Sequence, residues 1–318
     1  MIDKGKIFVP VMITPFSEKA KVDWDALAVL IDFYLACGVK GLFANCLSSE
    51  MYSITGDERL ELTAFVVKHV NGRVPVVATG SFGFTIEDKA SFTKQIFDKG
   101  IDAVVQVSGH FAKMDESDEI LFRNFEKMLS LTGNIPLGTY ECPVPYKRIL
   151  SAELFRRLVE TNRFIYHKDT AILPEWVKGK LEAIAGLEKM EFYDAHTPNT
   201  LFSLSHGARG MSSISGNFYP EIMVWMTQHA GDPERQEDLA WMQEELTRAD
   251  PLIQVAYPMS AKYFLQKRGL PVRTISRATA FQLMPDQRKA LDDLYDRFLH
   301  WCERLSITPV QVPAIPFH

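Results

Sequence analysis

The chain has 318 residues, of which 47% are hydrophobic and 24% charged, and its 35 basic and 40 acidic side chains give a net charge of −5. This composition is typical of a globular protein with a large core, and it excludes a disordered or fibrous chain. The slight acidity, with no run of five basic residues and no apolar window of about 18 residues, argues against a nucleic-acid partner, an anionic membrane surface or a membrane span.

Short apolar runs alternate with longer amphipathic segments in the first two-thirds of the chain. Eight runs, most of them rich in Val, Ile, Phe or Tyr, are typical of buried parallel strands. They cover residues 7–13, 41–46, 74–79, 103–107, 135–140, 163–168, 190–193 and 209–213. Helices are predicted between them, over residues 23–37, 57–70, 85–98, 117–130, 151–159, 173–185 and 199–206. The helix at 85–98 opens with Thr85 and has a carboxylate three positions later, which is the pattern of an N-terminal cap.

Strands that alternate with helices indicate βαβ units and a parallel sheet. Eight repeats favour a closed (β/α)8 barrel, the TIM barrel, over an open doubly wound sheet. A dinucleotide-binding sheet would need a Gly-rich turn after its first strand, whereas residues 14–17 read Thr-Pro-Phe-Ser. The predicted fold is therefore an α/β TIM barrel.

The length allows either two domains or one large barrel with an appendix. Four further helices are predicted after the eighth strand, at 221–230, 233–249, 253–267 and 285–304. We therefore expect residues 1–220 to form the barrel with the active site, and residues 221–318 to form a helical extension with a tail. The tail from Thr308 to Pro316 contains three prolines and is predicted not to be helical. It is apolar, and three fates stay open: packing on the barrel, packing on another subunit, or no fixed position.

The start of the chain and its cysteines indicate a cytoplasmic protein. The first apolar run is short, is interrupted by Pro10 and lacks a small-residue cleavage site, so it does not resemble a signal peptide. Four cysteines, far apart and without CxxC spacing, are expected to be reduced thiols: Cys37, Cys46, Cys142 and Cys302.

Two strand ends carry the strongest candidates for chemistry. Active sites of TIM barrels lie at the carboxyl ends of the strands, where the fifth predicted strand ends in Tyr140 and the sixth in Lys168. Adjacent strands are about 4.8 Å apart, so both side chains can share one mouth. A lysine inside a barrel is partly desolvated, which lowers its pKa and frees a neutral amine to attack a carbonyl. The alternatives are a rim lysine paired with Asp169 and a half-buried structural tyrosine.

Polar residues follow other strands. Ser48 and Ser49 can hold a carboxylate through hydroxyl and backbone N–H groups, or they form an ordinary loop of small polar residues. His110 follows the fourth strand and is either a titrating group near neutral pH or a structural or exposed histidine. Asp194 ends the seventh strand, where a carboxylate can contact substrate hydroxyls.

Several short motifs occur in an order that resembles one enzyme family. The resemblance covers residues 5–275 and is to the pyruvate-dependent class I aldolases that include dihydrodipicolinate synthase and N-acetylneuraminate lyase. Tyr140 and Lys168 are 28 residues apart, as the family's tyrosine and Schiff-base lysine are. The motifs are Thr14-Pro15-Phe16 with Val22-Asp23, Leu47-Ser48-Ser49-Glu50, Tyr140-Glu141-Cys142-Pro143, Tyr166-His167-Lys168-Asp169, Gly210-Met211-Ser212-Ser213 with Asn217 and Pro220, and Tyr257-Pro258-Met259-Ser260-Ala261-Lys262.

The resemblance implies a mechanism. Lys168 would form an imine with pyruvate or another 2-oxo acid, and Tyr140 would shuttle protons. Ser48 and Ser49 would hold the substrate carboxylate, with help from the backbone near Ser212. No metal or organic cofactor would be needed, because the lysine supplies the electrophile. The family also implies a homodimer or homotetramer.

Departures from the family pattern argue against a true dihydrodipicolinate synthase. Where the family has Pro-Tyr-Tyr after the fourth strand, this chain has Gly109-His110-Phe111, and Phe111 has no hydroxyl to relay a proton. Where the synthases place an arginine that binds the aldehyde substrate, this chain has Pro145, with Lys147-Arg148 just beyond.

Three hypotheses follow. The first is a Schiff-base aldolase or dehydratase acting on a 2-oxo acid, with a sugar acid as one option. The second is a barrel that has lost turnover and binds an oxo acid as a sensor, suggested by the altered segments 48–50 and 109–111. The third is a metal-dependent barrel enzyme that uses His110, Asp194 and His196, although the Asp-x-His pair alone has too few ligands for a metal.

Overall fold

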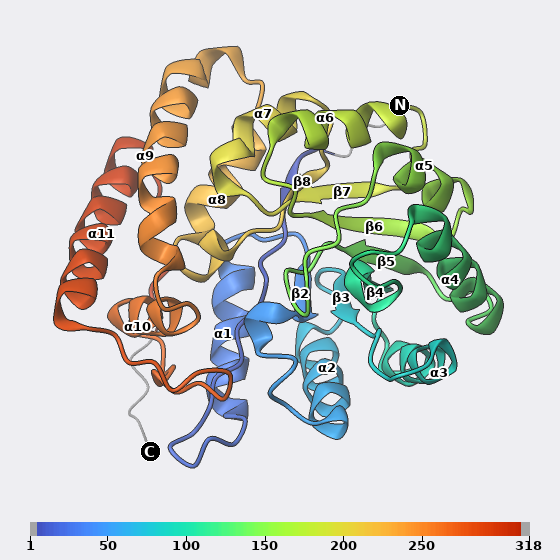
Figure 1. The fold of residues 1–318 in the computed structure, drawn as a ribbon. Helices are drawn as coiled ribbons and strands as arrows, with labels where there is room; N and C mark the ends of the chain where they lie inside the picture. The colour runs from blue at the N-terminus through green and yellow to red at the C-terminus, as the bar shows by residue number, and fades with distance from the viewer. Residues whose placement is uncertain (1–4, 313–318) are drawn as a thin grey trace.

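The computed structural model describes residues 5–312 and has the predicted TIM-barrel fold (Figure 1). Eight parallel strands follow one another in the order β1-β8-β7-β6-β5-β4-β3-β2, and a bridge between Val11 and Phe43 closes the ring. The strands are β1 (Ile7–Phe8), β2 (Leu42–Asn45), β3 (Val76–Thr79), β4 (Ala103–Val107), β5 (Leu137–Tyr140), β6 (Phe164–Asp169), β7 (Glu191–Asp194) and β8 (Gly210–Met211).

Helices surround the strands on the outside of the barrel, as Figure 1 shows. They are α1 (Trp24–Ala36), α2 (Gly56–Val70), α3 (Ile86–Phe97), α4 (Asp118–Leu131), α5 (Ala152–Glu160), α6 (Pro174–Ala183), α7 (Thr200–Ser205) and α8 (Pro220–His229). Local capping explains where several begin. The predicted cap at Thr85 is confirmed: its hydroxyl accepts from the Asp88 N–H at 3.0 Å, and the Asp88 carboxylate accepts from the Thr85 N–H at 3.0 Å.

The first strand is shorter than predicted. Only Ile7–Phe8 pairs with β8, although the apolar run continues to Ile13. Pro10 has no N–H to donate to a ladder, so the chain continues as extended backbone with isolated contacts to β2. β8 is equally short, and Gly210 packs so closely on the Ile7 carbonyl that a Cβ there would collide with it. These two strands therefore close the barrel by tight backbone contact.

The C-terminal part consists of α9 (Gln236–Gln254), α10 (Met259–Lys267) and α11 (Pro285–Arg304), which lie side by side next to the barrel (Figure 1). The predicted break near residue 250 is wrong, because α9 continues through Pro251 to Gln254. Pro251 lies on the exposed side of the helix, where water can satisfy the carbonyl that loses its partner. Short 3-10 turns complete the fold at Leu47–Ser49, Ser108–His110, Thr197–Asn199, Ile214–Asn217 and Pro233–Arg235.

The tail is described as far as residue 312, and residues 308–312 are not helical, as predicted. The Val310 N–H donates to Glu221 on α8 at 3.0 Å, and Val310 and Val312 pack against the core. These residues therefore lie on the barrel of their own chain; residues 313–316 of the predicted tail lie outside the described part. Across the described residues, no helix is long and apolar enough to cross a membrane.

Candidate active site

Lys168 and Tyr140 meet at the carboxyl ends of β6 and β5. Their Cα atoms are direct partners in the β5–β6 register, so both side chains face the barrel interior. Lys168 is 5% exposed and Tyr140 is 3% exposed, and the Lys168 Nζ lies 4.3 Å from the centroid of the Tyr140 ring. The two residues singled out from strand-end position are thus in contact.

The surroundings of Lys168 favour its neutral form. Burial lowers the pKa of this amine. Cys46, Cys142 and Asp194 raise it by a smaller amount, so the pKa stays below its ordinary value. The alternative, an ion pair between Lys168 and Asp169 at the barrel rim, does not form. Adjacent residues of a strand face opposite sides of the sheet, so the Lys168 side chain points into the barrel and the Asp169 side chain points away from it. The Asp169 carboxylate lies outside the barrel wall, where it binds Lys180 of α6. Lys168 is therefore a buried amine without a carboxylate bound to it among the described residues.

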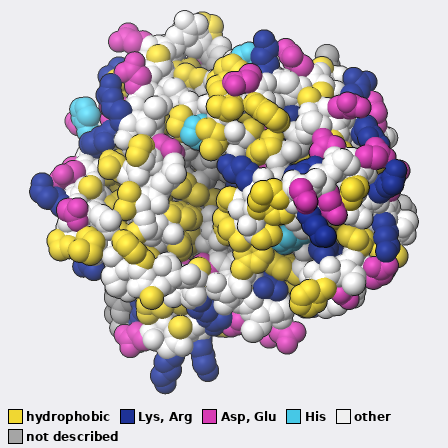
Figure 2. Space-filling view, in the orientation of Figure 1, with side chains coloured by type: hydrophobic (Ala, Val, Ile, Leu, Met, Phe, Trp, Pro, Cys, Tyr) yellow, Lys and Arg dark blue, Asp and Glu magenta, His cyan; other side chains and the backbone are white. Residues whose placement is uncertain are grey.

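A cavity of about 470 Å³ opens above Lys168 and Tyr140, between the barrel mouth and the C-terminal helices. Figure 2 shows this face of the molecule hollowed between those two parts. The C-terminal extension therefore builds one wall of the site as well as packing on the barrel. The lining residues are Leu47, Ser48, Glu50, Tyr140, Pro143, Lys147, Lys168, Thr170, Ile172, Ala195, His196, Ile214, Asp250, Gln254, Tyr257, Pro258 and Ala278.

The two predicted serines take different positions. Ser48 lines the cavity together with Tyr257, whose hydroxyl accepts from the Asn217 side-chain amide at 2.7 Å. Ser49 is fully buried, and its hydroxyl contacts the carbonyls of Met12 at 2.7 Å and Ala44 at 2.8 Å. Ser48 is thus placed to meet a ligand, whereas Ser49 holds the turn that presents it.

Asp194 and Ser212 do not line the cavity. The Asp194 carboxylate accepts from the Ser203 hydroxyl at 2.6 Å and from the His196 N–H at 2.7 Å. Burial, with a further contribution from Asp169, raises the pKa of Asp194 to about 7. Ser212 is fully buried, and its N–H donates to the Asp194 carbonyl at 2.8 Å. Neither side chain is among the cavity-lining residues: Asp194 faces away from the barrel interior, whereas the Ser212 hydroxyl lies inside the barrel, 3.5 Å from the Tyr166 hydroxyl.

His110 lies beside Tyr52 at the edge of the barrel mouth. Its Nε2 is 2.9 Å from the Tyr52 hydroxyl, and its Nδ1 is 2.7 Å from the Ser81 carbonyl. Burial lowers the pKa of His110 to about 4. The next residue, Phe111, is buried in a stack with Phe125, with ring centroids 4.4 Å apart. His110 is therefore a neutral, hydrogen-bonded histidine near neutral pH.

A buried ion pair ties the Ser48 turn to the C-terminal region. Glu50 follows the turn and accepts from the Lys262 ammonium of α10 at 2.7 Å. Its other oxygen accepts from the Ser276 hydroxyl at 2.8 Å and from the Arg277 N–H at 2.6 Å. Both members of the pair are buried, so the extension fixes the position of Ser48 through Glu50.

A second buried charge cluster joins β5 and β6 outside the barrel wall. Glu141 and Asp169 directly follow Tyr140 and Lys168, and the Lys180 ammonium of α6 binds both carboxylates. Burial raises the pKa of Asp169, but Lys180 outweighs it and leaves that pKa below its ordinary range. Among the described residues, Glu141, Asp169 and His167 are the only three grouped like metal ligands, and the Lys180 ammonium already binds both carboxylates. His110, Asp194 and His196 do not form such a group there.

Several cavity residues were not singled out from the sequence. Tyr257 belongs to a quoted motif, but it lies so far from Ser48 along the chain that the sequence did not show that both line one cavity. Lys147 lines the cavity and donates to the Thr170 carbonyl at 3.0 Å. Asp250 and Gln254 reach the cavity from α9, which no strand-end argument could find.

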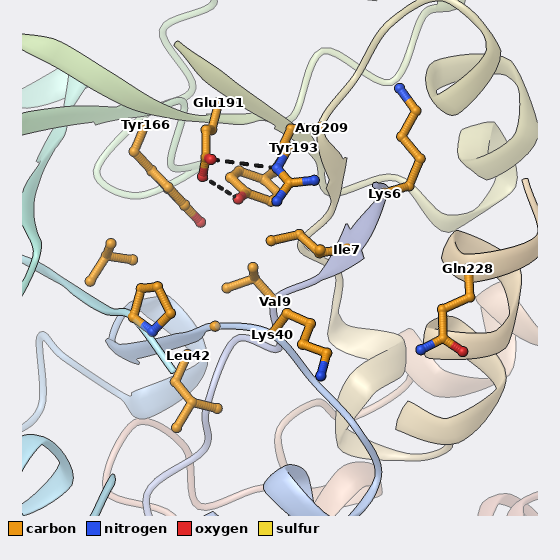
Figure 3. A pocket seen from close by; sticks show the side chains of 13 residues that line it. Lys6, Ile7, Val9, Lys40, Leu42, Tyr166, Glu191, Tyr193, Arg209 and Gln228 are labelled. Atoms are coloured by element: carbon orange, nitrogen blue, oxygen red, sulfur yellow. Dashed lines mark hydrogen bonds and ion pairs between the residues drawn. The ribbon is translucent and has the colours of Figure 1, made fainter. Parts of the chain in front are cut away.

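A second cavity, of about 450 Å³, lies at the opposite mouth of the barrel (Figure 3). Glu191 lines this cavity, and its carboxylate accepts from the Tyr193 hydroxyl at 2.7 Å and from the Arg209 Nε at 3.4 Å. The rings of Tyr166 and Tyr193 stack 4.9 Å apart and line this cavity; Tyr166 precedes Lys168 by two residues on β6, and Tyr193 is the register partner of Lys168 on β7. Because barrel chemistry resides at the carboxyl ends of strands, the cavity with Lys168 is the candidate active site.

Known proteins resemble the chain over almost its whole length. The sequence profile of the Dihydrodipicolinate synthetase family matches residues 4–297. The 4-hydroxy-tetrahydrodipicolinate synthases of Bacillus velezensis and Bacillus subtilis are 28% and 29% identical to this chain, respectively. The alignment with the Bacillus velezensis enzyme covers 89% of this chain and 96% of that enzyme. The alignment with the Bacillus subtilis enzyme covers 88% of this chain and 94% of that enzyme.

Solved structures show the same fold. YagE, a prophage protein of the dihydrodipicolinic acid synthase family from E. coli K12 solved in complex with pyruvate, superposes with a TM-score of 0.81 at 22% identity, covering 95% of this chain and 99% of that one. Dihydrodipicolinate synthase DapA-2 from Bacillus anthracis gives a TM-score of 0.81 at 24% identity, with coverages of 93% and 99%. The profile match over residues 4–297 confirms the resemblance drawn from the motifs: the chain belongs to the dihydrodipicolinate synthetase family and is a class I aldolase-type lyase of that family.

Proposed function

We propose that this protein is a Schiff-base lyase in which Lys168 forms an imine with pyruvate or another 2-oxo acid. The observation that carries the proposal is the buried Lys168 amine, with its pKa lowered by burial and its Nζ next to Tyr140 in a cavity. A lowered pKa increases the neutral fraction of the amine, and a neutral amine can attack a keto carbon without first losing a proton to water.

The reaction would use the two residues in turn. Lys168 Nζ adds to the keto carbon, and loss of water from the carbinolamine gives a protonated imine. The imine accepts the electron pair of a C3–H or C3–C4 bond, and an enamine forms. Burial raises the pKa of Tyr140 well above its ordinary value, so its hydroxyl stays protonated and can give a proton to the departing hydroxyl. No metal or organic cofactor enters this proposal.

Ser48 is the proposed carboxylate-binding residue of the 2-oxo acid. It lines the same cavity as Lys168, on the short turn Leu47–Ser49 that follows β2. Lys147 adds a positive charge to the same wall. A chain with a net charge of −5 does not attract anions by its overall field, so local groups such as these have to do so.

The second part of the substrate is proposed to be hydroxylated, as in a 2-oxo sugar acid. Polar side chains line the outer cavity: Thr170, His196, Asp250 and Gln254. The aldehyde substrate of dihydrodipicolinate synthase fits less well. Pro145 stands where the synthases have an arginine, and the nearby Arg148 binds Asp118 at 2.8 Å. We therefore propose cleavage or dehydration of a sugar acid in place of that synthase reaction.

A cytoplasmic homodimer or homotetramer completes the proposal. Three large apolar side chains just before α6 and in its first turn are about half exposed: Ile172 at 45%, Leu173 at 50% and Trp176 at 47%. An exposed apolar group of this kind supports self-association.

A turnover assay tests the function. Wild-type protein is incubated with a panel of 2-oxo-3-deoxy sugar acids, and released pyruvate and dehydrated products are measured separately. We expect turnover of at least one sugar acid, lowered on the order of 10³-fold or more in Lys168→Ala. Full activity of Lys168→Ala would contradict the proposal, and condensation of pyruvate with the synthase's aldehyde alone would contradict the substrate class. Tight binding without turnover would favour the sensor hypothesis.

A further inference from the structure

Tyr257 borders the candidate active site at a position where the family motif has a different residue. It opens the stretch Tyr257–Lys262, which resembles the family's Asn-Pro-x-x-x-Lys. It lines the same cavity as Ser48 and Lys168, and it belongs to the turn between α9 and α10. The chain therefore has a phenol hydroxyl at this wall of the cavity, where the family pattern has a side-chain amide.

The buried side-chain amide of Asn217 fixes the Tyr257 oxygen as a hydrogen-bond acceptor. The Val11 carbonyl, which can only accept, lies 2.8 Å from Asn217 Nδ2, and the Tyr34 hydroxyl donates to Asn217 Oδ1. These two contacts orient the amide, whose nitrogen then donates to the Tyr257 oxygen at 2.7 Å. An amide N–H cannot accept, so the hydrogen of the Tyr257 hydroxyl has to be directed at another acceptor.

Glu50 also lines the cavity, but its carboxylate is held by other donors. One oxygen accepts from the Lys262 ammonium at 2.7 Å, and the other accepts from the Ser276 hydroxyl at 2.8 Å and the Arg277 N–H at 2.6 Å. Burial raises the pKa of Tyr257, so its hydroxyl keeps its hydrogen. Tyr257 can therefore donate that hydrogen to a ligand in the cavity.

A 2-oxo acid has an acceptor next to the carbon that Lys168 would attack, because its carboxylate is bonded to the keto carbon. Of the two predicted serines, only Ser48 lines the cavity, since the Ser49 hydroxyl is held by two backbone carbonyls. No arginine is among the described residues that line the cavity. A carboxylate has two oxygens, so the Ser48 hydroxyl leaves acceptor capacity that Tyr257 can fill.

We propose that the Tyr257 hydroxyl donates to the carboxylate of the bound 2-oxo acid beside Ser48, and that it makes the cavity selective for 2-oxo acids over their neutral analogues. This rests on the proposed function of Lys168. A hydrogen bond to a charged group is about twice as strong as one to a neutral group, so an anionic ligand loses more when the hydroxyl is removed. Tyr257 is thus a specificity-determining residue that takes no part in the bond changes at the keto carbon.

The test measures imine formation as a function of ligand concentration. Wild type and Tyr257→Phe are titrated with pyruvate and, separately, with pyruvamide, its neutral amide, and the imine is reduced by borohydride and quantified by mass spectrometry. For Tyr257→Phe we expect the half-saturating concentration of pyruvate to rise about 10- to 100-fold, and that of pyruvamide about 3- to 10-fold. At saturating pyruvate the trapped fraction should equal that of wild type, because Lys168 is unchanged.

Tyr263→Phe is the matched control, because it removes a hydroxyl that is 2.9 Å from Asp292 and is not among the described groups lining the cavity. Its half-saturating concentrations should equal those of wild type. The proposal is refuted if Tyr257→Phe leaves the pyruvate value within twofold of wild type, or weakens both ligands by the same factor.

Wild type alone gives a second test that needs no variant. We expect it to be half-saturated by pyruvate at a lower concentration than by pyruvamide, and equal values for the two ligands would also refute the proposal. Absence of any trapped imine in wild type with either ligand refutes the proposed function of Lys168, which is a separate result.

Discussion

At the scale of single residues, the direction of a side chain decides what it can do. Lys168 pairs in register with Tyr193, and Asp169 pairs with Asp194. Partners in a ladder share a face, so Lys168 and Tyr193 point inward and the two aspartates point outward. The positions of the predicted strand ends correctly indicated that Lys168 and Tyr140 are neighbours. They did not give the register of β6 and β7, which turns the Asp194 side chain away from the cavity.

Asp194 gives a prediction about pH and stability. Its pKa is raised to about 7 in the folded protein, compared with about 3.9 in an unfolded chain. Between these values the folded state binds more protons, so this residue's contribution to stability falls as the pH rises from about 4 through 7. Asp194→Asn removes the charge, and its melting temperature relative to wild type should therefore rise between pH 5 and pH 8.

The control for this measurement is Asp115→Asn, on an exposed loop. Its melting temperature should follow that of wild type at every pH. A constant difference between Asp194→Asn and wild type across the same range would show that the Asp194 carboxyl titrates normally.

Among the elements, β5 and β6 are held together beside the ends that carry Tyr140 and Lys168. Lys180 of α6 reaches Glu141 after β5 and Asp169 at the end of β6, and all three side chains are almost fully buried. The sequence predicted both strands and the helix, because apolar periodicity and caps are local signals. It did not predict this cluster, because a lysine in a helix is usually exposed and only the packing of α6 on the barrel shows otherwise.

Removing the lysine should destabilise the fold strongly. Lys180→Met leaves two buried carboxylates without their partner, and we expect the free energy of unfolding in urea to fall by about 3–5 kcal/mol. The matched control is Lys178→Met on the same helix, whose ammonium is 3.7 Å from Glu182 on the surface. That change should cost less than about 1 kcal/mol.

A further variant tests the cause. The triple variant Lys180→Met, Glu141→Gln, Asp169→Asn removes the charges together and should recover part of the lost stability. If the single and triple variants are equally unstable, lost packing of the lysine stem explains the effect better than unpaired charge.

In the whole molecule, the C-terminal extension forms part of the candidate active site. Asp250, Gln254 and Tyr257 line the cavity, and Lys262 holds Glu50 beside the Ser48 turn. The sequence predicted the barrel and the additional helices. It could not show that the extension closes over the barrel mouth, because these contacts join residues about 200 positions apart. The division into residues 1–220 and 221–318 is therefore a division of sequence whose two parts share one site.

Lys168 is the amine that we propose to form the imine. Incubating the whole protein with pyruvate, reducing with borohydride and mapping the added mass by peptide mass spectrometry tests this proposal directly. We expect a single pyruvate adduct on the peptide that contains Lys168, and no adduct in Lys168→Arg. An adduct on another lysine, or an undiminished adduct in Lys168→Arg, would contradict it.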